Sequence, residues 1–216
     1  MIKKIALLFI IFGLTACSQR AQDISDTLNE AIFGFDDVTL SKEQINALPY
    51  ASAYVRINDG PQIFMVLGYA DTTTNGDTEL KWVSSDNAMI VTINGRITKT
   101  LNLPHNNLSA INFSLDEQPQ ISQTKAWTAS YDWQKDYQFG YKALATLTKL
   151  KPEQISSPLW KIEAEKWKEE VRFSGINQSL TNYYWLNANK KVIQTIQHLG
   201  PNMSKIEITF LKRYGE

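Results

Sequence analysis

The stretch MIVTINGRITKTL, residues 89–101, carries the clearest local structural signal in the sequence. Its two halves, residues 89–93 and 96–101, are rich in β-branched side chains and flank the dipeptide Asn94-Gly95. An Asn-Gly pair favours the two positive φ angles of a type I′ turn, whose twist suits a tight connection between antiparallel strands. The stretch therefore predicts a β-hairpin.

Strand patterns continue on both sides of this hairpin. Residues 51–57 alternate between apolar and polar side chains, as in a strand with one buried face, and the turn sequence Asn-Asp-Gly-Pro follows at 58–61. Further strands are expected at residues 63–70, 80–84, 127–133, 139–150, 180–186, 192–199 and 206–211. About ten short strands without a long helix predict an all-β fold, an antiparallel meander that forms a closed or partly open β-barrel.

Two segments depart from the simple strand pattern. Ser41 and Gln44 have the spacing of a capping box, which predicts a short helix that ends before Pro49. Residues 160–173 have the composition of a helix in part, but their first apolar side chains alternate with polar ones. We therefore expect a strand here, with a bulge near Lys166 or Trp167.

The N-terminus has the layout of an export signal. Two lysines, an apolar run at 5–14 and the sequence LTAC at 14–17 follow one another. The apolar run is about half the roughly 20 residues that a permanent membrane span requires. LTAC also resembles the bacterial lipobox, in which the signal peptide is removed before a cysteine that carries acyl chains. Lipidation is therefore expected at Cys17, and two or three acyl chains hold a protein stably on a membrane.

These features divide the chain into three parts. Residues 1–16 are expected to be the signal peptide, residues 17–37 the lipidated N-terminus with a short helical tether, and residues 38–216 a single barrel-like domain. Ser18 follows the cysteine in place of the aspartate that commonly retains lipoproteins on the inner membrane. We therefore expect an anchor in the outer membrane and a domain that faces the periplasm.

Composition argues against several classes of function. The chain has 22 basic and 22 acidic residues, and removal of Lys3 and Lys4 with the signal leaves a formal charge of −2, which gives no reason to expect nucleic acid as a partner. Cys17 is the only cysteine, so no thiol remains for a disulfide or a thiolate site. His105 and His198 lack metal-ligand spacing, and no nucleotide or nucleophile motif appears. No catalytic residue, metal or cofactor is predicted.

One acidic pair leaves an enzyme open as an alternative. Glu163 and Glu165 would lie on the same face of a strand, about 6.5 Å apart. Glycoside hydrolases use paired carboxylates, although their pairs normally come from different elements that line a cleft. The run of mixed charge at 163–170 is more typical of a solvated face.

Aromatic side chains are the remaining candidates for ligand contact. Flat rings can stack on the apolar faces of sugars, and they can equally fill the core of the barrel or cover sheet edges. The candidates for contact with a glycan are Trp127, Tyr131, Trp133, Tyr184 and Trp185.

The sequence also resembles a known family, the YjbF/GfcB lipoproteins, also called group 4 capsule polysaccharide lipoproteins. Besides the lipobox, the resemblance rests on LPYAS at 48–52, NDGPQ at 58–62, LKWV at 80–83, NGRITKTL at 94–101, YWL at 184–186 and LG at 199–200. It is weakest over 102–180. It implies an all-β periplasmic domain, encoded with an outer-membrane β-barrel protein and other periplasmic proteins, and involved in capsule or exopolysaccharide production.

The resulting hypothesis is a non-enzymatic accessory protein for polysaccharide secretion or assembly, which binds the polymer, the secretion machinery or both. Two alternatives belong to other classes. One is an enzyme that acts on periplasmic glycan through Glu163, Glu165 or another acid pair. The other is a carrier whose hollow barrel holds an apolar ligand.

Overall fold

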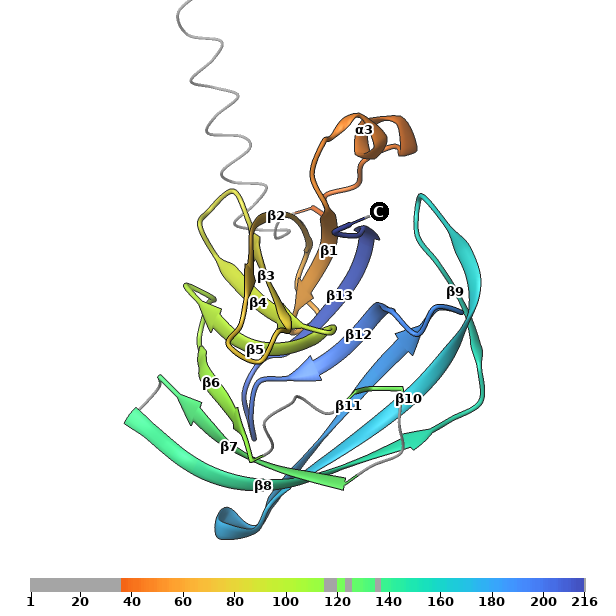
Figure 1. Cartoon of the computed structure of the whole chain (residues 1–216). Helices are drawn as coiled ribbons and strands as arrows, with labels where there is room; N and C mark the ends of the chain where they lie inside the picture. Colours follow the sequence, from red (N-terminus) through yellow and green to blue (C-terminus); the bar gives the residue numbers. More distant parts are fainter. Residues whose placement is uncertain (1–35, 115–119, 123–125, 135–136, 216) are drawn as a thin grey trace, which may run out of the picture. The chain divides into compact units, whose positions relative to one another are not determined.

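The computed structural model describes residues 36–114, 120–122, 126–134 and 137–215. Its strands all belong to one compact unit, Val38–Glu216 (Figure 1). The strands are β1 Ser52–Ile57, β2 Gln62–Thr72, β3 Thr78–Val83, β4 Met89–Ile93, β5 Arg96–Leu101, β6 Leu108–Phe113, β7 Ala126–Trp133, β8 Gln138–Lys149, β9 Glu153–Ser156, β10 Lys161–Phe173, β11 Gln178–Leu186, β12 Val192–His198 and β13 Lys205–Lys212. A short helix, α3, spans Lys42–Ala47, and a 3-10 turn, η2, spans Ser174–Ile176.

Twelve of these strands follow one another in an antiparallel ladder that begins at β5 and ends at β6, while β9 pairs with β10. The first and last strands of the domain, β1 and β13, pair in the middle of this ladder. The end strands β5 and β6 are joined by a backbone-to-side-chain hydrogen bond, in which the Leu108 amide donates to Thr100 Oγ1 at 2.9 Å. The sheet is thus a nearly closed barrel, which confirms the predicted fold class.

The predicted Asn-Gly hairpin is present as β4 and β5. Asn94 and Gly95 have φ angles of 51° and 84°, as the turn type requires. Its tip lies against β12: Gln197 Nε2 donates to the Gly95 carbonyl at 2.9 Å, and the Ile97 amide donates to Gln197 Oε1 at 3.0 Å. The hairpin therefore connects one end of the ladder to a strand in the opposite part of the barrel.

Large side chains fill the barrel. Trp82, Trp133, Tyr184 and Phe173 are all at most 2% exposed, and they belong to one continuous core. The ring of Trp133 contacts three other rings, those of Tyr131, Tyr141 and Phe173, at centroid distances between 5.1 and 6.0 Å. This packing does not favour the alternative of a hollow carrier.

Segment 161–173 is a strand, β10, as expected, but the predicted bulge near Lys166 or Trp167 is wrong. The pairing of β10 with β11 runs from Glu165 to Phe173 without a register shift. The buried side chains of β10 switch from one face of the strand to the other between Ala164 and Trp167, because each face is covered along a different part of the strand. Ala164 belongs to an apolar cluster separate from the one that holds Trp167.

This separate cluster lies where the β9–β10 hairpin packs. The β9–β10 hairpin extends beyond the end of β8, and Trp160 Nε1 donates to the carbonyl of Phe210 on β13 at 3.3 Å. Ala164, Trp185 and Ile193 are buried together in this cluster. Neither β9 nor β6 was predicted, since each falls in a stretch without regular alternation.

Helix α3 begins as predicted. Gln44 donates its backbone amide to Ser41 Oγ at 3.2 Å, and the Ser41 amide donates to Gln44 Oε1 at 2.7 Å. Ile45 then packs with Tyr54 and Leu211. Among the described residues, no helix combines the length and the apolar character that a bilayer span requires. Cys17 and nearly all of the predicted tether helix lie outside the described residues.

We expect Ser41→Ala to lower the free energy of unfolding by about 1 kcal/mol, because two amides at the start of α3 lose their capping arrangement. Urea unfolding monitored by tryptophan fluorescence measures the change. Ser41→Thr keeps a hydroxyl at the same position and is expected to lose much less. Equal stability of the Ala and Thr variants would show that the cap contributes nothing.

Candidate functional site

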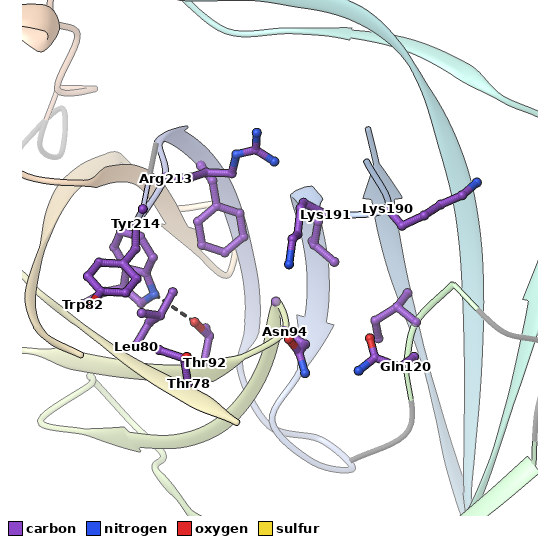
Figure 2. A pocket seen from close by; sticks show the side chains of 15 residues that line it. Thr78, Leu80, Trp82, Thr92, Asn94, Gln120, Lys190, Lys191, Arg213 and Tyr214 are labelled. Carbon is purple, nitrogen blue, oxygen red and sulfur yellow. Dashed lines mark hydrogen bonds between the residues drawn. The ribbon is translucent and has the colours of Figure 1, made fainter. Parts of the chain in front are cut away.

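A pocket of about 430 Å³ opens beside the filled core (Figure 2). Its wall is built from β3, the end of β4, the Asn94-Gly95 turn, the start of β12 and the end of β13. The lining residues are Thr78, Leu80, Trp82, Thr92, Asn94, Gly95, Gln120, Ile121, Lys190, Lys191, Val192, Phe210, Arg213, Tyr214 and Gly215. The predicted hairpin thus supplies part of the pocket wall.

The apolar part of the pocket is fixed by core packing. The rings of Trp82 and Phe210 lie 5.3 Å apart, centroid to centroid. Trp82 Nε1 donates to Thr92 Oγ1 at 2.9 Å, and the dashed line in Figure 2 marks this bond. Both Trp82 and Thr92 are 1% exposed. A buried hydrogen bond and a ring contact therefore hold this wall in one arrangement.

The rim of the pocket carries cations from the turn between β11 and β12. The Lys191 amide donates to Asn187 Oδ1 at 3.0 Å, which fixes the start of β12. Lys190 Nζ lies 2.6 Å from Glu165 Oε1, and Lys149 contacts the same oxygen at 2.9 Å. Hydrogen bonds from Lys190 and Lys149 lower the pKa of Glu165 to about 2. Lys190 therefore already has an anionic partner at neutral pH.

Lys191 differs from its neighbour. No ion pair involves Lys191 in the described part of the chain, and Figure 2 shows its side chain directed toward Asn94 while Lys190 points away. Arg213 and Tyr214 approach the pocket from the end of β13, and Tyr214 is 57% exposed. A cation, an exposed ring and amide side chains thus share this site.

The described lining of the pocket carries cationic and polar side chains, and it contains no acidic side chain. None of the 15 described residues that line the pocket is Asp, Glu, His or Cys. Glu163 and Glu165, the acid pair suggested by the sequence, are not among them. In the described ranges, no group of three or more His, Cys, Asp or Glu side chains is placed to hold a metal ion.

A second polar feature lies inside the barrel, where Arg96 and Glu169 form an ion pair of 2.7 Å at 2% and 1% side-chain exposure. Asn182 Nδ2 donates to the second oxygen of Glu169 at 2.9 Å, and the Tyr184 hydroxyl lies 3.0 Å from it. The Arg96 guanidinium also lies 4.8 Å from the ring centroid of Trp127. Every charged group in this cluster is therefore partnered.

The environment of this ion pair shifts the pKa values of its neighbours. Burial would lower the pKa of Arg96, but the carboxylate of Glu169 more than offsets burial and raises it. Burial, followed by the nearby Glu169, raises the pKa of Tyr184 and of Tyr131. Arg96 therefore stays charged, and both tyrosines stay neutral throughout the physiological range.

This ion pair was not predicted. The run at 163–170 was expected to be a solvated face, which is wrong for Glu169 because it points into the core between Trp167 and Val171. One signal was present in the sequence: the alternation of Trp167, Val171 and Phe173 places position 169 on the buried face. The partner Arg96 lies 73 residues away, and nothing local identifies it.

The five aromatic residues proposed for glycan contact are all packed in the structure. Trp127, Tyr131, Trp133 and Tyr184 belong to the main core, and none is more than 3% exposed. Trp185, 6% exposed, belongs to the separate cluster, where it donates to Glu153 at 2.9 Å. Their ring faces are occupied by protein atoms, so the structure corrects this prediction and assigns them to packing.

The two histidines are also separate from the pocket. His105 is exposed in a loop, with a φ angle of 75°. His198 lies on β12, and its Nδ1 is 3.0 Å from the Thr181 carbonyl. Tyr214, Lys191 and Gln120 were not predicted as site residues, because they are far apart in sequence and form no motif.

Comparison with known proteins gives this arrangement a family. Residues 25–211 match the family model "Group 4 capsule polysaccharide lipoprotein gfcB, YjbF". Two Escherichia coli K12 proteins are similar over nearly their whole lengths. Uncharacterized lipoprotein GfcB is 34% identical over 95% of each chain, and uncharacterized lipoprotein YjbF is 29% identical over 97% of this chain and 98% of its own.

A solved structure supports the same relationship. The crystal structure of the hypothetical lipoprotein YmcC from Escherichia coli K12 is 31% identical, with a TM-score of 0.71. The match covers 88% of this chain and 96% of that one. The family-model match, these relatives and the shared fold together show that this chain belongs to the group 4 capsule polysaccharide lipoprotein family of GfcB and YjbF.

Proposed function

We propose that this protein is an outer-membrane-anchored, periplasm-facing lipoprotein that acts as a non-enzymatic accessory in the secretion or assembly of capsule or exopolysaccharide. One observation supports binding over catalysis: the pocket beside the filled core is lined by cations, amides and aromatic rings, and its described lining contains no Asp, Glu, His or Cys. The family description supplies the link to capsule polysaccharide.

The position in the envelope is argued from the N-terminal sequence. The lipobox at 14–17 supports acylation of Cys17, and Ser18 in place of aspartate supports transfer to the outer membrane. The partners proposed on the same basis are an outer-membrane β-barrel protein and periplasmic proteins of a polysaccharide locus, together with the polymer itself.

We expect Cys17→Ser to abolish acylation and to shift the protein from the outer-membrane fraction, because the acyl chains supply the hydrophobic anchor. Membrane fractionation and intact-mass spectrometry of the product measure both effects. Ser18→Asp is the matched control: it should retain the acyl mass but move the protein to the inner membrane. An unmodified Cys17 in the wild-type protein would contradict the anchor.

The proposed function is tested by deletion of the gene in its own host. Extracellular polysaccharide should fall strongly and should be restored by the wild-type protein but poorly by Cys17→Ser. Chemical cross-linking of envelopes followed by affinity purification should recover an outer-membrane β-barrel protein. Normal polysaccharide in the deletion strain would overturn the proposal.

A further inference from the structure

We propose that the pocket binds an acidic sugar residue of a polysaccharide chain, with the ammonium group of Lys191 paired to the sugar carboxylate and the ring of Tyr214 against the sugar face. This inference rests on the proposed function, because it assigns the polymer to one site of the protein. The pocket is distinct from the buried aromatic residues that the sequence had suggested.

The pocket is positively charged, and one of its cations is free of ion pairs among the described residues. The lining contains three cationic side chains, Lys190, Lys191 and Arg213, and no carboxylate, although the mature chain is slightly acidic. Lys190 is paired with Glu165, and Arg213 also has an interaction partner within the chain, whereas Lys191 has no ion pair among the described residues. An anion that enters the pocket would therefore meet Lys191 as its principal partner.

The rest of the lining fits a sugar better than an acyl chain or a simple ion. Tyr214 is 57% exposed and offers a ring face, while Trp82 and Phe210 supply a fixed apolar wall. The amide groups of Asn94 and Gln120 lie on the opposite side from Tyr214 (Figure 2). A pyranose has an apolar face and a rim of hydroxyl groups, which are the two surfaces that this arrangement can complement.

Size limits the ligand to a short segment. A volume of about 430 Å³ lies within the range of roughly 300–1,000 Å³ that is typical of small-molecule sites. Lys191 and Tyr214 are exposed, so a chain can enter from solvent and leave again without being enclosed. The site therefore suits a residue within a longer polymer.

The surroundings of the pocket are not uniformly cationic, because the carboxylate of Asp77 lies close to Asn94. Asn94 Nδ2 donates to Asp77 Oδ1 at 3.2 Å, so one carboxylate lies just outside the lining. This hydrogen bond orients Asn94 and partners Asp77. Discrimination between acidic and neutral sugars is accordingly assigned to Lys191.

The test measures binding of defined trisaccharides to the mature, lipidated protein in non-ionic detergent by isothermal titration calorimetry. The probe is the α-1,4-linked trimer of galacturonic acid, and the galactose trimer of the same linkage is its neutral counterpart. The acidic trimer should bind more tightly than the neutral one, and the difference should shrink at high salt because the partly exposed pair is screened.

Two neighbouring lysines provide matched variants. Lys191→Met should weaken binding of the acidic trimer by roughly tenfold, whereas Lys190→Met should leave it within about twofold because Glu165 already engages Lys190. Tyr214→Ala should weaken both trimers. Each variant is compared with wild type by urea unfolding, so that a loss of binding is not a loss of folding.

The outcomes separate the site from the proposed function. Absence of saturable binding at millimolar trimer, equal affinity for both trimers, or equal affinities of Lys191→Met and Lys190→Met would overturn the site. Polysaccharide that still depends on the gene would then leave the proposed function standing. Specific binding in a protein whose deletion leaves polysaccharide unchanged would support the site and reject the function.

Discussion

Replacement of Glu169 by Ala is expected to lower the free energy of unfolding by about 3–5 kcal/mol, because it leaves the buried guanidinium of Arg96 without its partner. Asn182 Nδ2 and the Tyr184 hydroxyl lose the same carboxylate, and both are buried. Urea unfolding followed by tryptophan fluorescence measures the loss as a lower midpoint with an unchanged slope.

Two further variants isolate the ion pair from other effects of the mutation. Glu170→Ala removes a carboxylate on the opposite face, where its pair with Lys168 is partly exposed, and should change stability by less than about 1 kcal/mol. The double variant Arg96→Met with Glu169→Leu removes both charges and should recover much of the loss. A Glu169→Ala protein as stable as Glu170→Ala would refute the role assigned to the pair.

Gly95→Ala is expected to destabilise the protein by roughly 2–5 kcal/mol, through a strained backbone and an overpacked contact together. Gly95 has a φ angle of 84°, and a Cβ atom there would lie 2.5 Å from Val192 Cβ. Val192 is on β12, so relief of the clash requires the hairpin tip to move away from Gln197. Thermal and urea unfolding measure the effect.

Gly76→Ala is a close control, because Gly76 has a φ angle of 86° and nothing within 4 Å of the added Cβ. It should show only the backbone strain, about 1–2 kcal/mol. The difference between the two variants then reports the contact with Val192. Val192→Gly removes the Cβ atom that the new methyl group meets, so Gly95→Ala should cost less in a Val192→Gly background than in the wild-type protein. Equal losses at Gly76 and Gly95 would show that the tip does not pack as described.

Local chemistry made much of the fold predictable. The Asn94-Gly95 turn and the Ser41–Gln44 cap depend on the φ angles and hydrogen bonds of a few consecutive residues, so the sequence was sufficient for both. Alternation correctly placed Trp127, Tyr131 and Trp133 on one face of β7. The expected bulge in β10 was wrong because alternation reveals only which side is covered, and β10 is covered on both.

The site was much less predictable, because its parts come from distant segments. Lys191 and Tyr214 become neighbours of Asn94 only when β3, β4, β12 and β13 are assembled. Likewise, Arg96 and Glu169 are separated by 73 positions, and a lone glutamate in a run of charges is usually solvated. The aromatic residues were expected to contact a ligand but are buried, since the same rings can cover a sugar or fill a core.

The pairing of β1 with β13 has a consequence for how the chain acquires its structure. The hydrogen bonds that join the two halves of the ladder link Ser52–Ile57 to Ile206–Lys212, so they cannot form until the last strand has been synthesised. Contacts of such long sequence separation slow folding, and β1 has an unpaired edge until β13 has emerged. Neighbouring strands can pair as they are made, but the free edge of β1 stays open to other chains until β13 is available to cover it.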